Sequence, residues 1–309
     1  MARAANLKAE NKPAFEYDFA IKTGKTAPVV HDALNSAAMK GGARESRDSD
    51  AHPATTAVAV GFDVTGSMHS VPVTVQKKLC TLLGLLLRKS YLTDPAILVA
   101  GIGDATTDTA PCQIGQFESG NEIDADLAKI WLESGGGGQK TESYELFLYF
   151  LARKTKTDCF EKRGKRGYAF IIGDEMAYSR VKANEVKTWF GDDLESDIPV
   201  AQILKEAQEK WDIYFILPNL TSYYNDPEVS ESWRDLLGQQ FMKLDDPEGV
   251  AELIATVIGL AEDSVDRDTA AEHLKEAGAG TALVAAVTGA LATVGKGGSD
   301  LSGTGLSAV

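Results

Sequence analysis

Two hydrophobic periods alternate along the middle of the chain, one typical of buried strands and the other of amphipathic helices. Short, almost entirely apolar runs predict strands that are buried on both faces of a parallel sheet. They lie at Thr55–Phe62, Ala96–Ile102, Tyr168–Ile172 and Ile213–Leu217, with shorter candidates at Cys112–Phe117 and Phe241–Leu244. Most of these runs are followed by a segment with helical spacing, so an alternation of strands and helices is predicted.

The longest helical pattern begins near Ser70 and continues to Leu87, with Pro72 tolerated in the first turn. Further helices are predicted at Ile123–Leu132, Glu142–Ala152, Val181–Phe190, Val200–Trp211, Val229–Gln239 and Glu248–Leu260. Strands that alternate with helices of this length imply right-handed crossovers. We therefore predict an α/β fold with a doubly wound, mostly parallel sheet that carries helices on both faces.

The two ends of the chain lack this periodicity, which predicts three regions. Residues 1–54 are expected to form an arm in which Phe15, Tyr17 and Phe19 alternate with polar residues, as in a short docking strand. Residues 55–261 form the central domain. Residues 262–309 are first charged and then rich in glycine and alanine. From Gly278 onward we expect a flexible tail, and the alternative is a small-residue packing surface for another chain.

Composition narrows the classes of function. The 309 residues carry a formal net charge of -14, which disfavours binding to nucleic acid or anionic membranes and favours cations. No apolar stretch reaches the ~20 residues of a membrane span, and no secretory signal is expected. Three widely spaced cysteines fit neither a disulfide framework nor a zinc site. These features predict a cytoplasmic protein.

The first candidate for chemistry is the turn Asp63-Val64-Thr65-Gly66-Ser67, which lies where a buried strand ends and a helix begins. One carboxylate and two hydroxyls at alternate positions of a tight turn can converge on one point. Such oxygen ligands suit Mg²⁺ or Mn²⁺ better than zinc. The alternative is a helix cap, because Asp, Thr and Ser all cap helices.

Two further loops at the same predicted edge supply oxygen ligands. Thr141 follows a run of four glycines, and Asp174 directly follows the strand Tyr168–Ile172 and Gly173. Each residue alone is equally typical of a cap or a turn. Ligands in open α/β sheets bind beyond the carboxyl ends of the strands, where these loops should meet. The sequence therefore predicts a metal site on Asp63, Thr65, Ser67, Thr141 and Asp174.

This arrangement resembles the metal-ion-dependent adhesion site of von Willebrand factor A domains. The resemblance covers residues 55–261, although Glu175 follows Asp174 where that family often has glycine. It implies that Thr65, Ser67 and Thr141 bind the ion, that both acids often act through water, and that a partner's carboxylate fills the open position. Intracellular bacterial members often work beside AAA+ ATPases of the MoxR type, which the resemblance makes a candidate partner.

The favoured function is thus a metal-dependent protein-binding module and not an enzyme. One alternative is a metal-dependent hydrolase. For a hydrolase, Glu175 is the only obvious candidate for the catalytic base. The sequence shows neither a nearby histidine nor a second acidic cluster. Another alternative is a structural subunit that self-assembles through its arm and tail. The sequence is also compatible with a homo-oligomer.

Several other signals are given less weight. The segment Gly135–Thr141 resembles a phosphate-binding loop, but Gln139 stands where the pattern requires glycine. Asp104 and Asp108 are interpreted as solvated rim acids, with a supporting or recognition role as the alternative. The basic stretch from Arg153 to Arg166 is interpreted as a solvated connection, with a docking patch for an acidic partner as the alternative.

Overall fold

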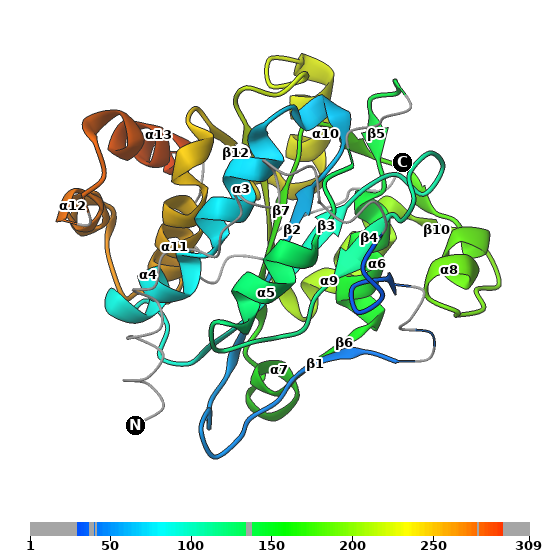
Figure 1. The fold of residues 1–309 in the computed structure, drawn as a ribbon, viewed down its shortest axis with the longest axis horizontal. Coiled ribbons are helices and arrows are strands. Elements are labelled where there is room, and N and C mark those ends of the chain that lie inside the picture. The colour runs from blue at the N-terminus through cyan, green and yellow to red at the C-terminus, as the bar shows by residue number, and fades with distance from the viewer. Residues whose placement is uncertain (1–29, 37–39, 41, 134–137, 277, 293–309) are drawn as a thin grey trace, which may run out of the picture.

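Six strands form the central sheet of the protein, which we describe from a computed structural model (Figure 1). The structure describes residues 30–36, 40, 42–133, 138–276 and 278–292, so the predicted strand around Phe15–Phe19 lies outside the described residues. The strands are β2 (Thr56–Asp63), β3 (Pro95–Ile102), β4 (Cys112–Ile114), β7 (Gly167–Ile172), β11 (Trp211–Pro218) and β12 (Phe241–Leu244). All six were predicted from the apolar runs.

The strand order is β12-β11-β7-β2-β3-β4, and every neighbouring pair is parallel except β3 with β4. Numbered along the chain, this is the doubly wound order 3-2-1-4-5-6. The direction of winding reverses between β2 and β7. Ligands of such sheets bind at this switch point, beyond the carboxyl ends of the two strands. Asp63 ends β2 and Asp174 follows β7, so the fold places both predicted acids there.

Helices cover both faces of the sheet, which confirms the predicted fold class. Val58, Val60 and Phe62 of β2 pack into one core, and Ala57 and Ala59 into the other, as the two-residue period of a strand requires. The first core is covered by α3 (Val71–Leu79), α4 (Leu82–Arg88), α5 (Glu122–Lys129) and α11 (Val250–Ala261). The second is covered by α6 (Tyr144–Arg153), α8 (Ala183–Trp189), α9 (Val200–Gln208) and α10 (Pro227–Leu237) (Figure 1).

The single helix predicted from Ser70 to Leu87 is wrong, because α3 and α4 are separate. The hydroxyl of Thr81 donates a hydrogen bond to the carbonyl oxygen of Lys78 at 2.7 Å. A side chain that hydrogen-bonds nearby backbone competes with the helical pattern. Hydrophobic spacing continues across the break because both helices face the same core, so the sequence pattern does not reveal it.

Short pairs of strands join the connecting loops. β5 (Thr141–Glu142) pairs with β8 (Met176–Ala177), and β9 (Arg180–Val181) pairs with β10 (Ile198–Pro199). Single turns of 3-10 helix occur at Gly66–Met68, Gly238–Gln240 and Pro247–Gly249. The β5–β8 pair matters most for the site, because it holds the loop with Thr141 against the loop with Asp174.

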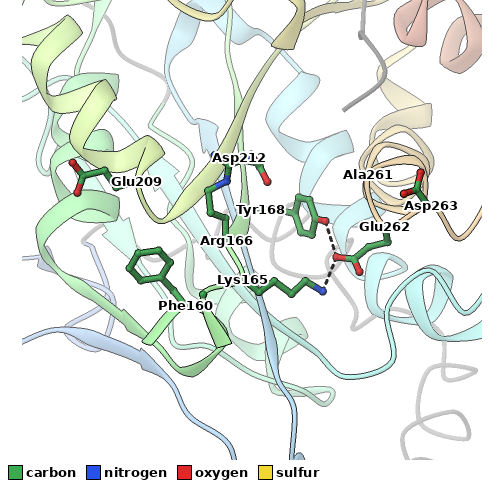
Figure 2. A pocket seen from close by; sticks show the side chains of 10 residues that line it. Phe160, Lys165, Arg166, Tyr168, Glu209, Asp212, Ala261, Glu262 and Asp263 are labelled. Atoms are coloured by element: carbon green, nitrogen blue, oxygen red, sulfur yellow. Dashed lines mark hydrogen bonds and ion pairs between the residues drawn. The ribbon is translucent and has the colours of Figure 1, made fainter. Parts of the chain in front are cut away.

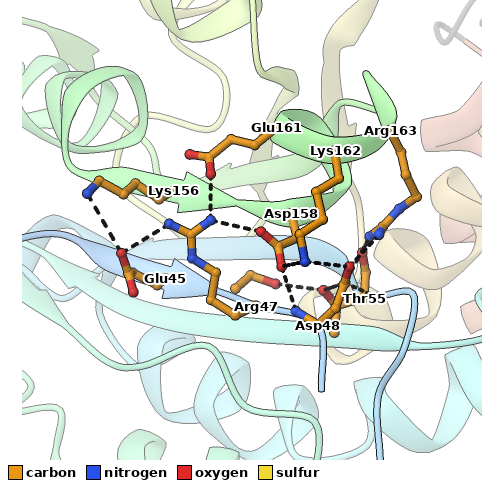
Figure 3. Close-up of polar contacts among 10 residues, drawn as sticks. Glu45, Arg47, Asp48, Thr55, Lys156, Asp158, Glu161, Lys162 and Arg163 are labelled. Carbon is orange, nitrogen blue, oxygen red and sulfur yellow. Dashed lines mark hydrogen bonds and ion pairs between the residues drawn. The ribbon is translucent and has the colours of Figure 1, made fainter. Parts of the chain in front are cut away.

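Part of the predicted arm docks on the basic stretch that follows α6. β1 (Arg44–Ser46) runs parallel to β6 (Thr155–Thr157), and α7 (Asp158–Arg163) follows directly (Figure 3). Asp48 of the arm accepts from Arg163 at 2.7 Å, and Arg47 pairs with Asp158 at 2.8 Å. The basic stretch was interpreted as a solvated connection or as a docking patch for an acidic partner. Neither interpretation is complete, because acidic residues of the chain's own arm pair with it.

The end of the described chain is helical and packed. α12 (Arg267–Glu276) and α13 (Thr281–Leu291) follow α11, and Val287 and Leu291 are buried in the first core. The expectation of a flexible tail is therefore wrong for residues 281–291. Glycine and alanine lowered the helical signal, but contact with the sheet layer stabilises a helix that would be marginal alone. Residues 293–309 lie outside the described residues.

Two further features bear on the predicted environment. Cys80, Cys112 and Cys159 are all free thiols. Within the described ranges, none of the helices has both the length and the apolar character needed to cross a bilayer.

Candidate functional site

The turn after β2 is organised around the carboxylate of Asp63. This side chain is fully buried, and its Oδ1 accepts from the backbone N–H of Thr65 at 2.8 Å and from the Thr65 hydroxyl at 2.6 Å. The Thr65 and Ser67 hydroxyl oxygens lie 3.3 Å apart. The alternate spacing of these residues therefore brings three side-chain oxygens to one point, as the sequence predicted.

Asp174 joins this group from the neighbouring strand. The Ser67 hydroxyl donates to Oδ1 of Asp174 at 2.7 Å, and the backbone N–H of Tyr223 donates to Oδ2 at 3.2 Å. Burial raises the pKa of Asp174, and the hydrogen bond from Ser67 opposes that shift. Hydrogen bonds therefore join Thr65 to Asp63 and Ser67 to Asp174, and the two hydroxyl oxygens lie 3.3 Å apart at the switch point.

The sequence did not single out Tyr144, which holds the other oxygen of Asp63. Its hydroxyl donates to Oδ2 of Asp63 at 2.6 Å, and burial raises the pKa of this phenol well above its ordinary value. The Tyr144 ring lies against Gly173, where a Cβ atom would overlap the ring and its hydroxyl. Gly173 thus gives the tyrosine room to reach the carboxylate.

Thr141 lies in the loop that the β5–β8 pair holds against the loop with Asp174. It occupies β5 opposite Met176, two residues beyond Asp174, and its side chain interacts with the hydroxyl of Tyr178. Its role as a ligand stays a prediction.

Glu142, the next residue, belongs to a cluster that the sequence did not predict. One carboxylate oxygen from each of Asp63, Glu142 and Glu175 lies within 4.8 Å of the others, and all three residues are buried. Oε1 of Glu142 has no hydrogen-bond partner among the described residues. Two full charges at this separation repel by about 3.5 kcal/mol at an effective dielectric constant of ~20. The cluster therefore needs protons or a cation.

Burial and repulsion between the carboxylates also shift the pKa values of the cluster. Burial, followed by the charge of Asp174, raises the pKa of Asp63. Burial, followed by the charge of Asp63, raises the pKa of both Glu142 and Glu175. Without a cation the cluster therefore retains protons near neutral pH, and a divalent ion would displace them because metal ligands bind deprotonated.

This cluster corrects one expectation. The hydrolase alternative was disfavoured because no second acidic cluster was visible, yet Glu142 and Glu175 lie beside Asp63. Glu142 had been assigned to a helix, whereas it ends β5. One signal was available in the sequence, because each of these acids directly follows a predicted ligand, Thr141 or Asp174.

The rim acids also differ from their solvated interpretation. Asp104 is only 2% exposed and accepts from the hydroxyl of Tyr178 at 2.8 Å. Asp108 accepts from the backbone N–H of Asp104 at 2.7 Å. Lys140 is the lysine of the segment that resembles a phosphate-binding loop. Its amine forms an ion pair with Asp226 at 2.6 Å. Asp104 thus supports the loops around the cluster.

The opposite edge of the sheet holds a polar hollow whose charges pair with one another (Figure 2). Lys165 contacts Glu262 at 2.6 Å, the Tyr168 hydroxyl donates to the same carboxylate at 2.6 Å, and Arg166 contacts Asp212 at 2.7 Å. Lysine and arginine neutralise these acids, whereas Asp63, Glu142 and Glu175 form a cluster of carboxylates. The candidate site is therefore the switch point.

No protein-family model and no curated protein matches this chain. Among solved structures, it is similar to the pilus adhesin SpaC from Lactobacillus rhamnosus GG, over 71% of this chain and 31% of the adhesin, with 10% identity and a TM-score of 0.49. It is also similar to a von Willebrand factor type A structure from Catenulispora acidiphila, over 67% of this chain and 42% of the other, with 13% identity and a TM-score of 0.42.

A third similar structure is the von Willebrand factor domain of the type V pili tip protein Mfa5 from Porphyromonas gingivalis. It aligns with 65% of this chain and 94% of its own, with 9% identity and a TM-score of 0.44. The chain thus spans less than half of the adhesin and of the Catenulispora structure.

Proposed function

We propose that this protein is a metal-dependent protein-binding module of the von Willebrand factor A type, with Mg²⁺ or Mn²⁺ at the switch point. The observation that carries the proposal is the convergence of four side chains, with Thr65 bonded to Asp63, Ser67 bonded to Asp174, and the two hydroxyl oxygens 3.3 Å apart. Two hydroxyls and two carboxylates from adjacent strands already lie together, as hard-cation ligands must. Thr141 is retained as a further ligand.

The partner is proposed to deliver a carboxylate to the ion. Mg²⁺ prefers octahedral oxygen coordination and usually keeps several waters, so an outside oxygen can replace one of them. Basic residues around the partner's acid would offset the net charge of -14 on this chain. A MoxR-type AAA+ ATPase is the candidate partner, on the family resemblance alone. A cytoplasmic location fits the three free thiols.

Specificity is assigned to the rim loops near Asp104, Asp174 and Tyr223, and Leu220 adds an apolar contact. Leu220 is 65% exposed and has a φ angle of 67°, which is unusual for a bulky residue. Its loop is tied to the site, because the backbone N–H of Ser222 donates to the carbonyl oxygen of Ser67 at 3.0 Å. Strained, exposed residues of this kind cluster at binding sites.

The first test measures the melting temperature with millimolar Mg²⁺ or Mn²⁺ and with EDTA. An ion that binds only the folded state raises the melting temperature by mass action, and a concentration of 100 Kd contributes about 2.7 kcal/mol. Ser67→Ala should remove most of this response, because it deletes one ligand. The matched control is Ser70→Ala, an exposed serine in the same connection. An unchanged wild-type melting curve would contradict the metal site.

The second part of the test measures partner capture from native lysate, with Mg²⁺ and with EDTA. Capture should fail in EDTA and with Ser67→Ala, and Leu220→Ala should weaken it while leaving the ion response intact. If the partner is captured equally with Mg²⁺, with EDTA and by both variants, the partner must bind another surface of the protein.

A further inference from the structure

The candidate site holds more negative charge than one divalent ion neutralises. Asp63 and Asp174 flank the two hydroxyls, and Glu142 and Glu175 lie on the other side of Asp63. Four carboxylates carry four negative charges when ionised. A single divalent cation neutralises two of them, so the other two carboxylates need either protons or a second cation.

The spacing of the buried acids suits a second ion. One oxygen from each of Asp63, Glu142 and Glu175 lies within 4.8 Å of the others. Opposite ligands of Mg²⁺ are about 4.2 Å apart and those of Ca²⁺ about 4.6–5.2 Å, since the metal–oxygen distances are about 2.1 and 2.3–2.6 Å. Oε1 of Glu142, in a residue only 3% exposed, has no hydrogen-bond partner among the described residues. A buried carboxylate oxygen without a donor needs a partner, and a cation can supply it where two further carboxylates lie as close as those of Asp63 and Glu175.

The surrounding structure holds these acids in place. Glu142 pairs with Ala177 in the β5–β8 ladder. The indole N–H of Trp233 donates to the backbone carbonyl of Glu175 at 2.8 Å, and the same ring stacks on Phe215 at 3.8 Å between centroids. Rigid support of this kind lets a site keep like charges together until a cation binds.

We propose that Asp63 bridges two divalent cations, the first on Thr65, Ser67 and Asp174 and the second on Glu142 and Glu175. The proposal rests on the proposed function for the first ion and adds the second. With both ions present the four carboxylates are neutralised, so a partner's acid no longer meets a net negative site. Bridged metal pairs in proteins are about 3.5–4 Å apart.

The test measures Mn²⁺ bound to the full-length protein by equilibrium dialysis and metal analysis, together with electron paramagnetic resonance. We expect two Mn²⁺ per chain and a spectrum broadened by coupling between neighbouring ions. Glu142→Gln and, separately, Glu175→Gln should each leave one Mn²⁺ with the sharp hyperfine pattern of an isolated ion. Glu145→Gln makes the same chemical change three residues from Glu142 and outside the cluster, so it should leave two.

The outcomes separate the two proposals. One Mn²⁺ in the wild type that survives Glu142→Gln and Glu175→Gln but is lost in Ser67→Ala would overturn the second site and leave the first intact. No bound Mn²⁺ in the wild type would overturn both. Two uncoupled ions would overturn the bridging role of Asp63. Because the wild-type stoichiometry alone distinguishes one site from two, the result does not depend on every variant folding.

Discussion

At the residue scale, two buried acids near the start of α6 have different environments. Glu142 belongs to the carboxylate cluster, whereas Glu145 is outside it and completely buried. Burial is the largest cause that raises the pKa of Glu145 well above its ordinary value. A buried carboxyl without adequate compensation stays protonated, so its proton is lost only when the protein unfolds.

This environment predicts how stability depends on pH. Above about pH 4.5 the unfolded chain ionises Glu145 while the folded protein keeps the proton, so the free energy of unfolding falls as pH rises. One proton corresponds to at most about 1.4 kcal/mol per pH unit. Glu145→Gln should therefore flatten the pH dependence between pH 5 and 8, measured by urea unfolding in EDTA. Parallel curves for the two proteins would contradict a buried neutral carboxyl.

At the element scale, the docking of β1 depends on ion pairs with α7. Asp48 accepts from Arg163 at 2.7 Å and from the backbone N–H of Thr55 at 3.1 Å. Asp48→Asn keeps the shape of the side chain but removes its charge, so we expect a loss of about 1.5–3 kcal/mol, since hydrogen bonds to charged groups contribute that much. Faster amide exchange in β1 is the measurement.

The control is Glu161→Gln, because Glu161 is 44% exposed and pairs with Arg47 at the surface. It should change stability by less than about 0.5 kcal/mol. The hydrogen bond from Arg163 lowers the pKa of Asp48 to about 2. Its contribution is therefore complete above the unfolded pKa of about 3.8 and is lost as pH falls towards about 2. Equal amide exchange of β1 in Asp48→Asn and Glu161→Gln would show that the β1–β6 backbone pairing, and not the charge of Asp48, holds the arm.

At the scale of the whole molecule, the packed unit extends beyond the predicted domain of residues 55–261. Leu291 of α13 is 2% exposed, and Leu283 and Val287 pack against Gly249 before α11. Leu291→Ala should destabilise the protein by about 2–5 kcal/mol, as for other buried leucines. Ala285→Ser changes an exposed position of the same helix and is the control.

Thermal or urea unfolding measures this difference, and limited proteolysis complements it. We expect the resistant fragment to retain α12 and α13, although the domain predicted from the sequence ends at residue 261. Early cleavage there, together with a neutral Leu291→Ala, would show that these helices are not part of the stable unit.

Much of the fold follows from local pattern. Apolar runs identified all six strands, because a strand buried on both faces has few polar positions, and even the short strand Phe241–Leu244 has only Lys243. The convergence of the turn from Asp63 to Ser67 could also be predicted, because its polar side chains are alternate residues whose oxygens meet within one turn. The link to Asp174 followed from the rule that parallel strands end at one edge.

Tertiary structure decided what local pattern does not encode. Glu142, Glu175 and Tyr144 reach Asp63 only because β5 pairs with β8 and α6 packs against Gly173. The docking of β1 on β6 likewise joins segments more than a hundred residues apart. Such contacts depend on where distant elements pack, whereas hydrophobic periodicity reports only which face of each element is buried. Sequence thus determined the sheet and the turn that carries the first predicted ligands, and packing determined the charge that surrounds them.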